Sequence, residues 1–129
     1  MKKTTEDWLI SAESDLILIQ EIITNENLTH LSAFHAQQAI EKSFKAIIEE
    51  FDLGFTKTHS LEMLYNKVKE KIFPVINTDL FVLIDQLYID ARYPGEMGLL
   101  PEGKPSISEA KEFFDLGKEV LGYTKSSCK

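Results

Sequence analysis

A line of polar side chains, starting just after Ser32, has the residue types needed to bind an anion. On a helix these side chains share one face at spacings of three, four, three and four residues, and they are His35, Gln38, Lys42, Lys45 and Glu49. Lysines can neutralise phosphate, and an imidazole titrates near neutral pH, so it can act as a general acid or base. The alternative is a face that is merely solvated, as most charged helix faces are.

Two further residues could take part in the same chemistry. Arg92 is the only arginine in the chain and is followed by Tyr93 and a proline. Its planar guanidinium could bind phosphate, with Tyr93 stacking on a base, or it could bond the last carbonyls of a helix. His59 could transfer protons, or it could bond the neighbouring backbone at the start of a helix.

The chain lacks the usual marks of a metal or cofactor site. It has no zinc-ligand spacing, no glycine loop that would cradle phosphate and no nucleophile–base pattern. We therefore expect no metal ion and no cofactor. Cys128 is the only cysteine, which excludes an intrachain disulfide and fits a reducing, cytoplasmic environment.

Size and charge narrow the class of protein. The 129 residues, 43% of them hydrophobic, are enough for a single domain over 1–129 with a genuine core. The net charge of −7 does not fit a general nucleic-acid binder, which usually has a basic stripe, so any RNA contact must be confined to a small site. No apolar run approaches the roughly 18 residues that span a bilayer, and we expect no membrane contact.

Hydrophobic periodicity and cap residues predict an all-α fold, an antiparallel bundle of four to five helices. The predicted helices cover about 5–24, 29–52, 60–71, 78–92 and 106–123. The sequence places a cap at Thr4 or Thr5, a stop at Gly54 and a capping box from Ser106 to Glu109, and it predicts fraying from Lys125.

Glu41 and Gln37, both in the second predicted helix, each have an expected type of partner. Glu41 and Lys45 are four residues apart in the order that favours a helix ion pair. Gln37 lies near the apolar boundary, so it could satisfy a buried backbone group where two helices cross.

Several segments together resemble the HEPN family, whose name stands for higher eukaryotes and prokaryotes nucleotide-binding. The run Phe34–Lys42 followed by Lys45 and Ala46 resembles the family's second helix. The segments 57–61 and 91–94 resemble the start of its third helix and the end of the next. The first helix also fits, through Trp8, Ala12, Asp15 and Leu16.

The resemblance implies a helical bundle that commonly dimerises. Many members are toxin-like partners of small nucleotidyltransferases, and similar bundles serve as substrate-binding domains of nucleotidyltransferases. Another large group are metal-independent ribonucleases, in which an arginine and a histidine four to six residues further on form a composite site at the dimer interface.

This chain departs from the ribonuclease motif. The positions where the histidine would stand are Met97, Gly98 and Leu99, and no histidine follows Arg92. Loss of acid–base catalysis, worth about 10²–10⁴ in rate, could silence such a site. The sequence therefore favours a non-catalytic binding module, a homodimer that pairs with a nucleotidyltransferase or binds a nucleotide or RNA.

Two alternatives remain open. The first is a ribonuclease that uses Arg92 with His35 or His59. The second is a helical scaffold in which every residue named above serves packing or solubility.

Overall fold

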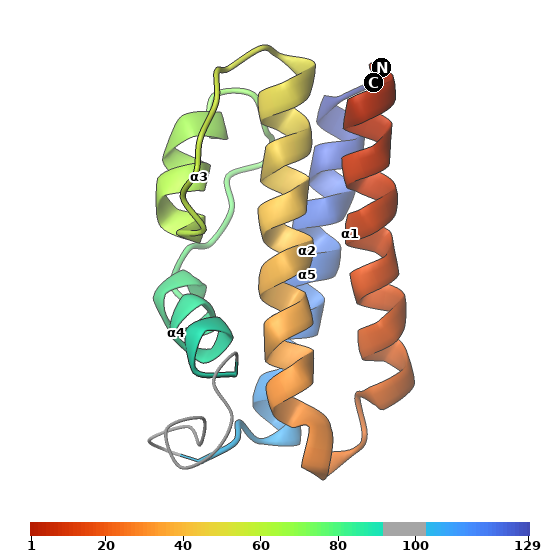
Figure 1. The fold of residues 1–129 in the computed structure, drawn as a ribbon, viewed down its shortest axis with the longest axis vertical. Helices are drawn as coiled ribbons and strands as arrows, with labels where there is room; N and C mark the ends of the chain where they lie inside the picture. The colour runs from red at the N-terminus through yellow and green to blue at the C-terminus, as the bar shows by residue number, and fades with distance from the viewer. Residues whose placement is uncertain (92–102) are drawn as a thin grey trace.

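The computed structural model of the chain describes residues 1–91 and 103–129, and over these residues it contains no strand. Five α-helices and one short 3₁₀ turn make up the described part of the fold (Figure 1): α1 (Lys3–Ile22), the turn η1 (Glu26–Leu28), α2 (Thr29–Glu50), α3 (Leu61–Val68), α4 (Phe81–Ala91) and α5 (Ile107–Ser127). The prediction of an all-α bundle is confirmed.

The three long helices lie side by side, and the two short ones flank α2 (Figure 1). The backbone N–H of Lys2 donates to Glu50 Oε1 at 3.0 Å, which ties the start of α1 to the end of α2. Lys104 Nζ donates to the carbonyl of Asn27 at 2.9 Å, which ties the segment before α5 to the turn before α2. Consequently α1 runs antiparallel to α2, while α2 and α5 run in the same direction, with α3 and α4 on the chain between them.

Helix α2 is the centre of the bundle because it contacts all four other helices. An apolar stripe of α2 with helical spacing is buried at Ala33, Ala36, Ile40, Phe44 and Ile47, whereas Phe51 is only partly buried because it follows the last helical residue. Contact on several sides also buries residues outside the stripe, among them Ala39, Ser43 and Ala46. Small side chains at these positions allow neighbouring helices to approach closely.

Aromatic residues anchor the short helices to α2. The Phe44 ring lies 5.7 Å from Tyr65 of α3 and 6.0 Å from Phe81 of α4, measured between centroids. The Tyr65 hydroxyl also accepts from the backbone N–H of Ile76 at 3.1 Å, which fixes the segment between α3 and α4. These contacts hold α3 and the first turn of α4 in place against α2.

Some helix ends form where the cap residues predict them, and others do not. The Ser106–Glu109 capping box is present as predicted. The predicted cap at Thr4 or Thr5 is wrong, because α1 starts at Lys3 and the buried Thr5 hydroxyl instead donates to Glu50 at 2.9 Å. Helix α2 ends before Gly54, with Asp52 taking a positive φ of 51°.

The expected fraying from Lys125 is also wrong. Helix α5 continues to Ser127, and the N–H of Cys128 bonds the carbonyl of Thr124 at 3.0 Å. Both Thr124 and Cys128 are buried, so packing against the core extends the helix beyond the point where its sequence signals weaken.

Candidate ligand-binding site

His59 is held in place by two side chains of α2. Gln37 Nε2 donates to the backbone carbonyl of His59 at 3.0 Å, and Glu41 Oε1 lies 3.0 Å from His59 Nδ1. The His59 side chain nevertheless remains 56% exposed. The sequence allowed for a histidine that bonds nearby backbone. In the structure its ring instead contacts the carboxylate of Glu41, 18 residues earlier in the chain.

Glu41 is the buried hub of this arrangement. Its side chain is 5% exposed, and it accepts from Lys45 Nζ at 2.8 Å and from Gln37 Nε2 at 3.1 Å in addition to contacting His59. The predicted Glu41–Lys45 pair is therefore confirmed, but it is a buried pair rather than a surface one. Lys45 also lies over the Trp8 ring of α1, with Nζ 5.4 Å from the centroid.

Asp85 of α4 fixes the chain next to His59. Its Oδ2 accepts from the backbone N–H of Leu61 at 3.0 Å, and its Oδ1 accepts from Gln37 Nε2 at 3.4 Å. Ser60 caps α3 by accepting from the N–H of Met63 at 3.3 Å. Burial raises the pKa of Asp85 above its ordinary range, although the hydrogen bonds from Leu61 and Gln37 oppose that shift.

These residues border an open pocket of about 320 Å³, lined by His59, Ser60, Asp85, Tyr88 and Ile89. The Tyr88 ring lies 6.1 Å from His59 and stacks on Phe34 at 5.0 Å between centroids. The pocket thus has an aromatic and aliphatic wall beside an imidazole, a hydroxyl and a carboxylate. This combination of apolar walls with a few convergent polar groups is typical of small-molecule sites.

A second cluster joins α1 to α2. Asp15 is 7% exposed, and its two oxygens lie 2.8 Å from His35 Nδ1 and 2.8 Å from Lys42 Nζ. The Lys42 and His35 side chains are 21% and 24% exposed. Lys42 and His35 therefore face α1 rather than open solvent.

The predicted polar face of α2 is thus divided between two clusters. His35 and Lys42 share Asp15, whereas Lys45 and His59 share Glu41, and Gln38 donates to Gln37 Oε1 at 2.8 Å. Both ammonium groups of this face are already paired with a carboxylate. Arg92 and Tyr93 lie outside the described residues, and Arg92 follows Ala91, the last residue of α4, directly in sequence.

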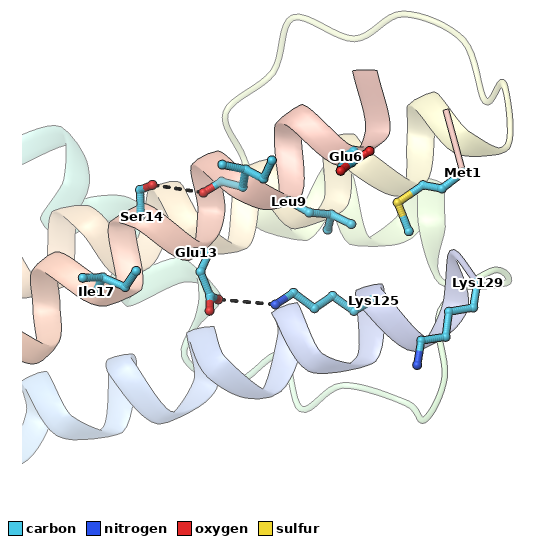
Figure 2. Close-up of a pocket in the computed structure, with 9 residues that line it drawn as sticks. Met1, Glu6, Leu9, Glu13, Ser14, Ile17, Lys125 and Lys129 are labelled. Carbon is cyan, nitrogen blue, oxygen red and sulfur yellow. Dashed lines mark hydrogen bonds and ion pairs between the residues drawn. The ribbon is translucent and has the colours of Figure 1, made fainter. Parts of the chain in front are cut away.

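A larger groove lies between α1 and the C-terminal end of α5 (Figure 2). Its volume is about 610 Å³, and it is lined mainly by Leu9, Ile10 and Ile17 with charged residues at its rim. The one interaction drawn across it joins Glu13 Oε2 to Lys125 Nζ at 3.5 Å. Its apolar lining suits a protein surface better than a catalytic site.

Within residues 1–91 and 103–129 there is no group of three or more histidine, cysteine, aspartate or glutamate side chains that could hold a metal ion. None of the helices described is long and apolar enough to cross a membrane.

The sequence model of the HEPN domain family matches residues 5–126 of this chain. The chain belongs to the HEPN domain family. The crystal structure of an archaeal HEPN homologue superposes with a TM-score of 0.71 and 24% identity, covering 100% of both chains. At this identity the likeness shows the HEPN fold alone. No curated protein sequence gives a significant match.

Sequence reasoning missed three residues of this HEPN domain's site. In the sequence Asp15 contributes only to the family resemblance, although a carboxylate beside the apolar residues Ala12 and Leu16 signals a buried partner. Asp85 interrupts the apolar pattern of α4 in the same way. Tyr88 follows the apolar period of α4, so its sequence position indicates only packing, and it is the fold that brings it near His59.

Proposed function

We propose that this HEPN domain is a binding module for a nucleotide or another phosphate-bearing ligand, without catalytic activity of its own. The observation that carries the proposal is the fixation of His59. Its carbonyl and its ring are both held by buried side chains of α2, while the ring itself is exposed at a pocket. A histidine with only a packing role would not need both of these contacts to fix its position.

The chemistry of the pocket fits part of a nucleotide. Its volume of about 320 Å³ is near the lower end of the range for ligand pockets, which suits a base and its sugar. Tyr88 and Ile89 offer apolar surface to a base, and His59 offers an N–H donor to a phosphate or a ribose oxygen. Arg92, one residue beyond the end of α4, supplies the guanidinium of the proposed phosphate contact, with Tyr93 beside it in sequence.

The remaining predicted ligand residues have a supporting role in this proposal. His35, Gln38, Lys42 and Lys45 belong to the two clusters that join α1, α2 and the segment before α3. They keep the elements of the site together, while His59 and Arg92 contact the ligand.

The test is equilibrium binding of the four nucleoside 5′-monophosphates to the full chain in the presence of EDTA. We expect at least one to bind, and Arg92→Ala and His59→Ala each to weaken it about tenfold, because each removes a charge-assisted hydrogen bond. Lys57→Ala is the control, since this exposed cation precedes His59 in the same loop but does not line the pocket. Absence of binding by the parent chain would refute the proposal.

A second candidate function is metal-independent ribonuclease activity that uses Arg92 and His59. The observation in its favour is the contact between His59 Nδ1 and Glu41, because a histidine whose Nδ1 donates to a carboxylate keeps Nε2 for proton transfer. Labelled RNA incubated in EDTA separates the two functions. Cleavage by the parent that is lost in both Arg92→Ala and His59→Ala would establish the enzyme, whereas intact RNA favours the binding module.

We also propose that the domain forms a homodimer through the groove of Figure 2. Ile10 and Ile17, which line it, are 55% and 58% exposed. The groove carries acidic residues on α1 and lysines at the end of α5, so a second copy related by a two-fold axis could match the charges of the first.

Light scattering tests this interface. Ile17→Glu should produce a monomer, while Val82→Glu, at a position 69% exposed on α4, should remain a dimer. A monomeric parent would refute the interface. Pairing with a nucleotidyltransferase is the remaining part of the proposal, and it rests on the family alone.

A further inference from the structure

We infer that Asp85 makes the pocket beside His59 selective for a guanine base, presented by a mononucleotide or by the end of an RNA. This inference rests on the proposed function, since it names the ligand that the same pocket takes.

The argument starts from the hydrogen bonds that Asp85 has already made. An ionised carboxylate can accept about four hydrogen bonds, two at each oxygen. In Asp85, Oδ2 accepts from the N–H of Leu61 at 3.0 Å and Oδ1 accepts from Gln37 at 3.4 Å. Each oxygen therefore has room for one more donor, and Asp85 is one of the five residues that line the pocket.

Two parallel acceptors call for two parallel donors. Guanine has such a pair on its Watson–Crick edge, where the N1–H and the 2-amino group lie next to each other. Adenine and cytosine each place an amino group beside a ring nitrogen that only accepts, and uracil has a single N–H between two carbonyls. Bases that are not paired in a duplex are commonly read through this edge.

The other charged groups near Asp85 favour the base end of the ligand at this position. Glu41 and Glu62 both act on Asp85 as like charges, so a phosphate would be repelled from the inner part of the pocket. The N1–H and the 2-amino group of guanine would instead give the partly buried Asp85 carboxylate two further hydrogen bonds. The apolar wall formed by Tyr88 and Ile89 leaves room for the face of the ring.

The decisive experiment compares GMP with IMP, because the two nucleotides differ only in the 2-amino group. Binding is measured at one fixed pH for the parent chain and for Asp85→Asn. We expect GMP to bind the parent at least about tenfold more tightly than IMP, and that ratio to fall towards one in Asp85→Asn. Asparagine keeps an oxygen that can accept from Leu61, and circular dichroism checks that the variant is folded.

A second pair of variants tests the location without altering Asp85. Ile89→Trp should weaken every nucleotide by filling the pocket, and Ile89 is 46% exposed, so the core is not disturbed. Val82→Trp lies two turns earlier on the same helix, outside the pocket lining, and should leave binding unchanged.

Each outcome separates this inference from the function on which it rests. If no nucleotide binds the parent chain, the proposed function fails. If GMP and IMP bind equally, or if Asp85→Asn keeps the preference, the guanine assignment fails while nucleotide binding stands. If Ile89→Trp binds as well as the parent, the ligand lies elsewhere and the pocket assignment fails.

Discussion

Glu41 and Asp15 each contact one histidine and one lysine, although they lie on different helices. Burial of a charge is costly unless it is paired and hydrogen-bonded. Here Asp15 has two nitrogen partners and Glu41 has three, and the histidines and lysines among them retain some exposure to water. The positive residues that the sequence presents as a binding face are thus part of the framework of the domain as well.

Neutralising Glu41 should destabilise the domain. Glu41→Gln keeps the size of the side chain but removes the charge that pairs with Lys45, so we expect a loss of about 1–3 kcal/mol in the free energy of unfolding. Urea denaturation measures it. Asp7→Asn is the control, because it breaks an exposed pair with Lys3 and should change stability by less than about 1 kcal/mol. Equal effects of the two substitutions would contradict this account.

Asp85 should make stability depend on pH in the opposite sense to most carboxylates. Burial raises its pKa in the folded state above the ordinary value of 3.8, so the folded chain binds this proton more tightly than the unfolded chain. The contribution of Asp85 to stability therefore falls as the pH rises from about the unfolded pKa through the raised folded pKa.

Urea denaturation of the parent and Asp85→Asn across this pH range checks the sign. The free energy of unfolding of Asp85→Asn minus that of the parent should increase as the pH rises from acid to neutral. A difference that decreases with pH would mean that hydrogen bonding to the ionised form outweighs burial.

At the scale of the helices, two glycines of α5 meet different surroundings. A methyl group at Gly122 would have no neighbour within 4 Å, whereas one at Gly117 would lie 3.0 Å from Leu16 Cδ2 of α1. Gly122→Ala should therefore stabilise the domain by about 0.5–1 kcal/mol through helix propensity. Gly117→Ala should gain less, since Leu16 must move. Thermal melting of both variants measures the difference, and equal gains would contradict the close packing of α1 on α5.

The helices were predictable because their signals are local. The capping box at Ser106 and the apolar period of α2 are both read from a few adjacent residues, and both are confirmed. The start of α1 was not predictable in this way. Thr5 has the chemistry of a cap, yet its hydroxyl bonds Glu50, and that contact exists only after α1 and α2 have packed.

The candidate site was predictable only in part for the same reason. The polar face of α2 can be read from its spacing, but its division between Asp15 and Glu41 depends on how α1 and the segment before α3 are placed around it. Asp85 and His59 are 26 residues apart, and no local pattern links them. Their proximity follows from aromatic packing of α3 and α4 on Phe44.

At the scale of the whole molecule, Cys128 should report on unfolding. The side chain is buried, and burial together with the nearby Glu50 raises the pKa of its thiol to about 11. A thiolate-specific reagent should thus react slowly with the native chain and quickly in denaturant. Since no other cysteine is present, the signal is unambiguous. Immediate labelling of the native chain would show that the end of α5 opens readily.

The central position of α2 has a consequence for synthesis of the chain. Residues 3–50 can form a helical hairpin early, but the side of α2 that packs on α5 stays uncovered until residues 107–127 have been made. Buried positions on that side, such as Ala39 beside Gly117 of α5, are then exposed to other chains while the ribosome adds more than half of the protein. Nascent chains with such surfaces tend to aggregate, so the rate of elongation and access to chaperones should govern how much of this protein reaches its native state.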